Sequence, residues 1–344
     1  MNIYWLLCGN KKNPSSRIHG INIHKRIVEL GYNSILVHSP FFYSLDLIWN
    51  QYFISFFLKN IKGDDIIIFQ KLRGPKTLYL IDQLKNRGAK VVFIDCDLPL
   101  KLEVAEKANL IICPSNILAD HYKNAGCENV KVIYDAVEIY KEPQMSSFNS
   151  KKLIWFGKSG LGKWELIQKF KEEQLIKIAP NWSFSILSDH KDSDFIWNIK
   201  SFAQIISKCD ISIIPVDDKD ESLVKSANRC TQSMALGVPV LANCLSSYSE
   251  VIINYENGLI SNNWNEWKDF LIKCEQSDFL YSLKKKAYQD SLKFSISNIS
   301  KEWVALLGLK ISKKDFTNCL LDQLKFHFVL SVVASSKWFY DRKA

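Results

Sequence analysis

The sequence predicts an α/β protein built from two doubly wound, Rossmann-like domains. Strand-like apolar runs alternate with helical patterns from the first residues onward, as in βαβ units around a parallel sheet. The alternation lapses once, in a polar stretch at residues 141–152, and then restarts. A length of 344 residues suits two domains at about 100–200 residues each. We therefore place the first domain at 1–140, a linker at 141–152, the second domain at 153–300 and C-terminal helices at 301–344.

The first domain reads as six strands with helices between them. We expect strands at residues 3–8, 34–38, 65–69, 90–94, 110–113 and 130–133, and helices at 18–30, 45–58, 76–87, 102–107 and 116–125. Gly31 and Gly88 follow two of these helices, in the position where glycine commonly ends a helix. Six strands of this kind make a complete doubly wound domain.

The second domain repeats the pattern after the linker. We expect strands at residues 153–156, 183–187, 211–214 and 238–242, helices near 163–173, 199–207 and 223–236, and mostly helical sequence from residue 264. The C-terminal helices at 301–344 are expected to pack back on the first domain or to touch a membrane. Ligands of open α/β sheets bind beyond the carboxyl ends of the strands, so the cleft between two such domains is where we look for chemistry.

Composition narrows the class of protein. Hydrophobic residues make up 47% of the chain and charged residues 24%, which excludes a disordered chain. The net charge of +9 favours anionic partners. Nine cysteines without a C-x-x-C pair indicate reduced thiols and a cytoplasmic location. Neither a signal peptide nor an apolar run of the roughly 18–20 residues that span a bilayer is recognisable.

The most informative motif lies in residues 225–243, KSANRCTQSMALGVPVLAN, followed by Glu250 and the triplet NGL at 257–259. It reads as a helix with a polar first turn, then a strand and a glycine turn. A helix N-terminus attracts anions, and Lys225, Asn228 and Arg229 add donors to that end. A diphosphate fits this arrangement.

This segment resembles the C-terminal domain of retaining GT-B glycosyltransferases close to glycosyltransferase family 4. Residues 209–215 and 132–137 resemble two strands of the same template, so the resemblance covers about residues 1–300. It implies a GT-B fold with a cleft between two domains, and metal-independent transfer of a sugar from a nucleotide-diphosphate sugar, UDP- or GDP-linked ahead of CMP-linked. The donor is a substrate, and no cofactor is implied. The acceptor would be a glycan or a lipid-linked glycan in bacterial surface polysaccharide assembly (capsule, O-antigen or lipooligosaccharide).

The resemblance also assigns roles to residues. Lys225 and Arg229 would act in catalysis by stabilising the leaving diphosphate. The other donor-binding positions in this segment are Asn228, Gln232, Ser233 and Glu250. The two glutamates that the family carries eight positions apart fall here on Val224 and Gln232. Gln232 can still bond a ribose hydroxyl, but the donor sugar and the stereochemical outcome stay open.

A glycine turn, GKSGLGKW at residues 157–164, has two interpretations. As a Walker A loop it would cradle phosphates, but Trp164 stands where Ser or Thr must hold magnesium. In the glycosyltransferase template, Gly157, Lys158 and Lys163 would bind the donor diphosphate. A P-loop nucleotide hydrolase or kinase therefore stays as an alternative, as does a glycine turn with solvated lysines.

Two sites are expected in the first domain. The loop at residues 13–20 places Ser16, Arg17 and Gly20 as contacts to acceptor or diphosphate, with His19 as a candidate base. Asp95-Cys96-Asp97 spells the D-x-D of metal-dependent transferases of another fold, yet the second-domain motifs argue against a metal. Asp95 is therefore expected to contact a sugar hydroxyl or to act as base. Three polar residues are weaker candidates of the same kind: Gln70, Lys71 and Arg73.

The segment at residues 41–58 is unusually rich in aromatic residues. Helices that are apolar on nearly all sides are usually buried. Together with the basic, aromatic tail at 337–343, the segment could instead make peripheral contact with anionic lipid at the inner face of the cell membrane. Basic residues are too dispersed to predict a nucleic-acid partner. A non-catalytic glycan-binding protein remains a further alternative.

Overall fold

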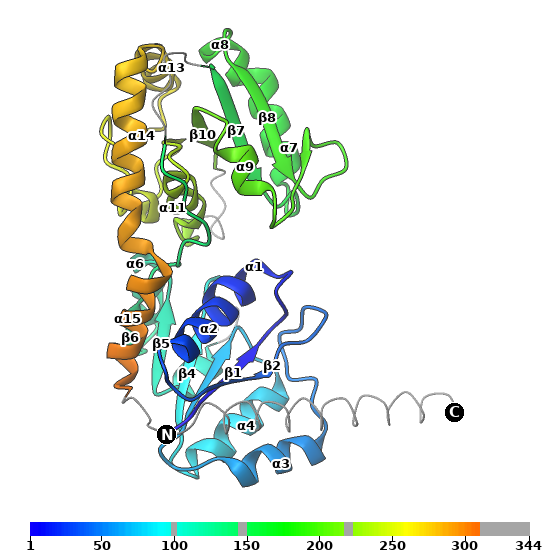
Figure 1. Ribbon diagram of the computed structural model, residues 1–344. Coiled ribbons are helices and arrows are strands. Elements are labelled where there is room, and N and C mark those ends of the chain that lie inside the picture. Colours follow the sequence, from blue (N-terminus) through cyan, green and yellow to red (C-terminus); the bar gives the residue numbers. More distant parts are fainter. Residues whose placement is uncertain (98–101, 144–149, 217–222, 310–344) are drawn as a thin grey trace, which may run out of the picture. The chain divides into compact units, whose positions relative to one another are not determined.

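A computed structural model describes residues 1–97, 102–143, 150–216 and 223–309 (Figure 1). The chain forms two compact units, each with its own sheet. Of the described residues, unit 1 contains those within Met1–Pro114, Ala119–Ile133 and 296–309. Unit 2 contains Ser115–Leu118 and Tyr134–Ser295.

Unit 1 is built on a parallel sheet with the strand order β2-β1-β3-β4-β5-β6. Its strands are β1 (Ile3–Leu7), β2 (Ser34–His38), β3 (Ile66–Gln70), β4 (Lys90–Ile94), β5 (Leu110–Cys113) and β6 (Val130–Val132). The continuous apolar sequences of β1 and β3, IYWLL and IIIFQ, are buried throughout because helices cover both faces of such a sheet.

The helices of the first 133 residues connect these strands. They are α1 (Pro14–Ser16), a π-helical turn (Arg17–Ile21), α2 (Asn22–Glu29), α3 (Gln51–Asn60), α4 (Pro75–Lys85), α5 (Glu103–Lys107) and α6 (Asn116–Asn124). The late helix α15 (Ile296–Leu307) packs on α2 of unit 1. Its Trp303 lies 5.5 Å from Trp5 of β1, measured between ring centroids. The basic, aromatic tail at 337–343 lies outside the described residues.

Unit 2 repeats the architecture with the strand order β12-β11-β10-β7-β8-β9. Its strands are β7 (Lys152–Gly157), β8 (Ser183–Ser188), β9 (Phe195–Ile196), β10 (Ile211–Ile214), β11 (Val240–Ala242) and β12 (Gly258–Ile260). Its helical elements are α7 (Lys163–Phe170), a π-helical turn (Lys171–Leu175), α8 (Ile176–Ile178), α9 (Phe202–Ile206), α11 (Asn228–Ala235), α12 (Ser246–Ser249), α13 (Trp264–Lys273), α14 (Ser277–Ser291) and a 3-10 turn (Leu292–Phe294).

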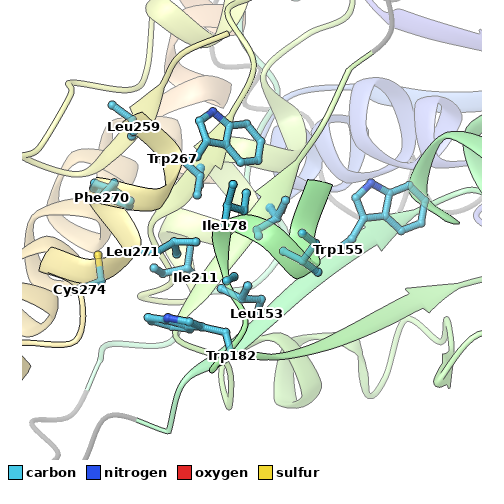
Figure 2. Close-up of a cluster of buried hydrophobic side chains, with 14 of the residues drawn as sticks. Leu153, Trp155, Ile178, Trp182, Ile211, Leu259, Trp267, Phe270, Leu271 and Cys274 are labelled. Carbon is cyan, nitrogen blue, oxygen red and sulfur yellow. The ribbon is translucent and has the colours of Figure 1, made fainter. Parts of the chain in front are cut away.

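One face of the unit 2 sheet packs on α13. In this core, Trp155 of β7 and Ile211 of β10 belong to one buried cluster with Trp267 and Phe270 of α13 (Figure 2). This apolar packing fixes one face of the sheet on α13. The polar loops follow the ends of the strands.

Two predicted helices begin later than the sequence suggested. The helix expected at 45–58 is α3, which starts only after Asn50, because the Asn50 side chain accepts a hydrogen bond from the N–H of Phe53 at 2.9 Å. The helix expected at 223–236 is α11, which starts at Asn228. None of the described helices combines the length and the apolar character that crossing a bilayer requires.

Candidate functional site

In unit 2, two loops meet where the strand order reverses. Strand β7 lies beside β10, and the chain builds outward from this pair in both directions, so the point between them is the switch point at which α/β sheets bind ligands. A Cβ added to Gly157, the last residue of β7, would lie 3.6 Å from Nη1 of Arg229 in the first turn of α11. The glycine loop and the start of α11 thus converge, although 72 positions separate the two residues.

A buried tyrosine holds Arg229. The Arg229 Nη2 donates to the Tyr248 hydroxyl at 3.4 Å. Tyr248 of α12 is 2% exposed, and burial raises its pKa to about 12, although the guanidinium opposes this. The partner of Arg229 is therefore a neutral oxygen, which positions the cation without cancelling its charge.

The loop after β7 is fixed by an aspartate after β8. The Ser159 backbone N–H and hydroxyl donate to Asp189 Oδ1 at 2.8 and 2.9 Å. Burial works to raise the pKa of Asp189, but the two bonds from Ser159 outweigh it and hold that pKa below its ordinary value. Leu161 and Gly162 adopt left-handed backbone angles, with φ of 62° and 76°. The exposed Lys158 sits in this shaped loop.

An aromatic pair marks the start of α7. Trp164 stacks on His190 with ring centroids 3.8 Å apart and planes 11° from parallel. Neither α7 nor α11 has a side chain that caps its N-terminus. In the first turn of α7, however, the Trp164 N–H donates to the Ser159 carbonyl at 3.1 Å. The uncapped start of α11 is the helix N-terminus that favours an anion.

The remaining predicted donor residues lie on or near α11. Gln232 is 5% exposed; its Oε1 accepts from the Glu138 N–H at 2.9 Å and its Nε2 donates to the Ile139 carbonyl at 2.8 Å. The buried Ser233 hydroxyl lies 2.8 Å from the Val238 carbonyl.

Glu250 accepts a hydrogen bond from the Tyr134 hydroxyl at 2.6 Å. Lys163, Lys225 and Asn228 are half-buried. The donor-binding roles assigned to these residues, Gln232 and Ser233 included, stay predictions.

Unit 2 also contains a cavity of about 510 Å³ at the ends of β10, β11 and β12. Phe170, Leu245 and Trp264 supply apolar walls, and Asn243 and Asn262 supply amides. None of the predicted site residues lines it.

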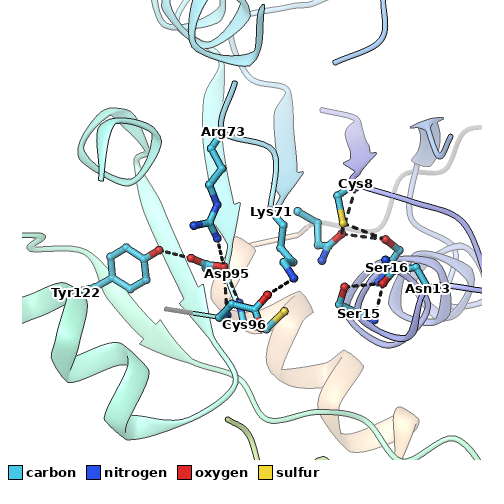
Figure 3. Close-up of polar contacts among 11 residues, drawn as sticks. Cys8, Asn13, Ser15, Ser16, Lys71, Arg73, Asp95, Cys96 and Tyr122 are labelled. Atoms are coloured by element: carbon cyan, nitrogen blue, oxygen red, sulfur yellow. Dashed lines mark hydrogen bonds and ion pairs between the residues drawn. The ribbon is translucent and has the colours of Figure 1, made fainter. Parts of the chain in front are cut away.

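In unit 1, a buried polar cluster lies at the ends of β1 and β3 (Figure 3). The Cys8 thiol and the Ser16 hydroxyl both donate to Gln70 Oε1, at 3.2 and 3.1 Å. Asn13 caps the following helix by accepting from the N–H of Ser15 at 3.1 Å. A Cβ on Gly20 would lie 2.5 Å from the Leu7 side chain, so a larger residue there would require the buried Leu7 side chain to move.

The two predicted residues between Ser16 and Gly20 differ in environment. Arg17 is 7% exposed and its Nη1 donates to the Lys11 carbonyl at 3.0 Å. His19 is half-buried in the π-helical turn. Their roles in acceptor or diphosphate binding stay predictions.

Both aspartates of the D-x-D sequence have basic partners. Lys71 pairs with Asp97. Arg73 Nη2 lies 2.6 Å from Oδ1 of Asp95 (Figure 3). Tyr122 also donates to Asp95, which is fully buried. Burial raises the pKa of Asp95, while Arg73 and Tyr122 oppose the rise. In the described part of the chain, no three acidic, histidine or cysteine side chains form a group that could hold a metal ion.

Charge and backbone geometry set Lys71 apart. Burial works to lower its pKa, but attraction to the acidic groups of Cys96 and Asp97 outweighs burial and raises it. Its φ of 61° is left-handed, and its Nζ lies 5.4 Å from the centre of the Tyr43 ring. The geometry thus holds an ammonium group at the end of β3.

Several site residues were missed at the sequence level. Tyr248, Tyr122 and His190 act through partners far away in the chain, which no local pattern reveals. One local signal was present in the sequence: a polar residue at the end of an apolar strand, as Gln70 is in β3, indicates a polar site at that edge of the sheet. Gln70 is fully buried, and within the described residues its Nε2 makes no hydrogen bond.

Comparisons with known proteins bear on the fold. No protein-family model matches the chain, and no curated protein matches it in sequence. Among solved structures, HepE from Anabaena in complex with UDP is 16% identical, with 90% of this chain and 100% of HepE covered and a TM-score of 0.62. The lipopolysaccharide outer core galactosyltransferase WaaB is 11% identical, with 90% and 99% covered and a TM-score of 0.60.

A third structure, TarM of S. aureus in complex with UDP and other ligands, is 16% identical, with 74% of this chain covered and a TM-score of 0.58. The match spans only 58% of the TarM chain. The chain has the GT-B fold. That fold class is the one predicted from the sequence.

Proposed function

We propose that the protein is a glycosyltransferase that moves a sugar from a nucleotide-diphosphate sugar to a glycan or lipid-linked acceptor in bacterial surface polysaccharide assembly. The observation that carries the proposal is the convergence of Arg229 with the Gly157 loop at the switch point of unit 2. The solved structures of similar fold include complexes with UDP and with UDP-glucose, which supports a nucleotide-sugar donor.

In the proposed reaction, the bond between the sugar C1 and the diphosphate oxygen breaks, and a bond from C1 to an acceptor hydroxyl oxygen forms. The nucleoside diphosphate leaves with the bonding electrons, and the acceptor proton passes to a base. Arg229, Lys158 and the N–H groups at the start of α11 stabilise the negative charge that develops on the diphosphate. These cationic and dipolar groups make the transfer independent of a metal ion.

We assign the acceptor to unit 1. Its buried cluster contains paired charges and neutral hydrogen-bonding groups, which suit the hydroxyls of a sugar better than an anion. The Oε1 of Gln70 is held by Cys8 and Ser16, while its Nε2 makes no hydrogen bond within the described residues. Lys71 follows it in the chain and has a left-handed backbone conformation. Residues in sparsely populated backbone conformations cluster at binding sites, and the left-handed backbone of Lys71 therefore supports a site here.

The P-loop alternative receives less support. Trp164 occupies the position of the magnesium-binding hydroxyl, and its ring stacks on His190. A thermal-shift comparison separates the alternatives: UDP or GDP stabilises a transferase, ATP with Mg²⁺ stabilises a P-loop enzyme, and neither stabilises a glycan-binding protein.

The decisive test is Arg229→Ala. Removal of one charge-stabilising group from the transition state lowers kcat by about 10²- to 10³-fold. Release of nucleoside diphosphate from a donor sugar measures this, with EDTA present throughout. Arg229→Lys should retain part of the activity, and Lys268→Ala, an exposed site on α13, should retain all of it. Normal turnover by Arg229→Ala would refute the proposal.

A further inference from the structure

Unit 1 exposes an unusual number of large apolar side chains in a short stretch. Phe41 is 98% exposed, Phe42 60% and Tyr52 86%. The other exposed members are Tyr43, Leu45, Ile48, Phe56 and Tyr79. We call these eight residues the aromatic face. Single exposed apolar residues are ordinary, but a gathering of eight needs an explanation.

The core of unit 1 does not need these side chains. The same segment sends a separate set inward: Leu47, Trp49, Phe53, Ile54, Phe57 and Leu58 are all buried. Trp49 lies 4.5 Å from Phe53 and 5.2 Å from Phe57 between ring centroids. The sequence predicts either a buried segment or a contact surface here, and in the structure one set of its side chains is buried while the other is exposed.

The aromatic face is held by its backbone. The Phe41 carbonyl accepts from Asn10 Nδ2 at 3.0 Å, and the Ser44 N–H donates to the Cys8 carbonyl at 2.8 Å. The Leu45 carbonyl accepts from the N–H of Arg73 at 2.6 Å. The loop is thus anchored while its rings point to solvent.

Contacts connect this loop to the exposed side of the following helices. Asp46 accepts from the Thr77 N–H at 2.9 Å, at the start of α4, and Tyr79 lies two positions further on. Gln51 Nε2 donates to the Tyr79 hydroxyl at 3.2 Å, which joins α4 to the start of α3. Tyr52 and Phe56 follow one turn apart on the exposed side of α3. The apolar residues therefore run from the loop across α4 to α3.

Charge around the aromatic face is positive. Four exposed lysines lie near these residues. Lys11 and Lys12 follow Asn10 in the chain, Lys59 lies one helical turn after Phe56, and Lys76 lies one turn before Tyr79. Between residues 39 and 63 the only acid is Asp46, whose carboxylate accepts the N–H groups at the start of α4. On α4, Asp82 lies three positions after Tyr79 and pairs with Lys107.

We propose that the aromatic face docks on the surface of an anionic lipid bilayer. Rings enter the boundary between headgroups and acyl chains, while the lysines around them meet anionic headgroups. A second copy of the chain fits less well, because a two-fold contact through this surface would bring lysines against lysines. The proposal does not depend on the chemistry of the switch-point site.

Flotation of the full chain with vesicles tests the proposal. We expect binding to phosphatidylcholine vesicles with 30% phosphatidylglycerol at low salt, and at least tenfold weaker binding to pure phosphatidylcholine or in high salt. Phe41→Ser with Phe42→Ser should lower the partition coefficient at least tenfold. The control pair, Ile176→Ser with Ile272→Ser, changes two apolar side chains of unit 2 that are 66% and 54% exposed, and it should bind as the unchanged chain does.

Circular dichroism shows whether the variants fold. We expect them to fold, because the substituted side chains are exposed and contribute little to the core. Tyr52→Ser with Phe56→Ser provides an independent test on α3. Absence of binding to anionic vesicles at low salt would overturn the proposal, as would equal loss in the control pair. A dimer in solution that Phe41→Ser with Phe42→Ser dissociates, without vesicle binding, would also overturn it in favour of self-association.

Discussion

The two units share one architecture, but the basic residues near their strand ends have different partners. In unit 1, Arg73 faces the fully buried Asp95, and Lys71 faces Asp97, so the charges cancel locally. In unit 2, Arg229 is held by the neutral hydroxyl of Tyr248. The first arrangement neutralises its charges within unit 1, and the second leaves the positive charge of Arg229 uncancelled by its partner. Under the proposed function, the first would suit the hydroxyl groups of an acceptor and the second the diphosphate of a donor.

The largest expected effect comes from breaking a pair in unit 1. Arg73→Ala leaves Asp95 buried without its cation, which should lower the free energy of unfolding by about 3–5 kcal/mol. Urea unfolding measures the loss.

Lys107→Ala is the matched control for this change. It removes a surface ion pair with Asp82, whose side chains are 38% and 48% exposed, and should cost only about 0–1 kcal/mol. Equal losses in both variants would show that the Arg73 pair does not stabilise unit 1 as a buried pair.

Acid should weaken unit 1 before unit 2. Burial lowers the pKa of His24 and of His38 from 6.5 to about 4. Between these values the unfolded chain binds more protons than the folded one, so stability is complete above pH 6.5 and falls as pH drops toward 4. Each histidine contributes up to about 3 kcal/mol to this loss. The lowered pKa of Asp189 in unit 2 acts only below its ordinary value of 3.8.

Hydrogen exchange at pH 7 and pH 5, corrected for intrinsic rates, locates the loss. Amides of β1 and β2 should lose protection at pH 5 while those of β7 and β10 keep theirs. His38→Asn keeps a donor for the Leu7 carbonyl, which His38 Nδ1 contacts at 2.9 Å, but does not titrate. An unchanged slope of unfolding free energy with pH in this variant would exclude His38 as a cause.

The sequence predicted buried strands better than helix starts, although it missed the exposed two-residue strand β9 and took the position of β12 for a glycine turn. There is a physical reason. A parallel strand buried on both faces is a continuous apolar run, so IIIFQ could be recognised without its neighbours. The start of α3 was expected at residue 45, because the apolar run continues upstream of Asn50, whereas the side chain of Asn50 sets the start of the helix. The candidate site residues also fall into two groups, those that local motifs indicate and those that they do not. The glycine loop and Arg229 were found from motifs, whereas Tyr248, Tyr122 and the Trp164–His190 pair exist only once the chain has folded.

The smallest expected effect tests whether Tyr248 positions Arg229. A hydrogen bond of 3.4 Å is long, so Tyr248→Phe should remove only about 0.5–1.5 kcal/mol of interaction. If the guanidinium then loses its orientation toward the diphosphate, affinity for UDP falls about two- to tenfold, as measured by calorimetry.

Tyr140→Phe is the matched control, since its hydroxyl also makes a 3.4 Å bond within unit 2, to the Ser291 carbonyl. Both variants should lose similar stability, yet only Tyr248→Phe should lose nucleotide affinity. A loss of affinity in both would mean that Tyr248 supports the fold of unit 2 without positioning Arg229, and the contrast between a neutralised unit 1 and a positive unit 2 would then rest on Arg229 alone.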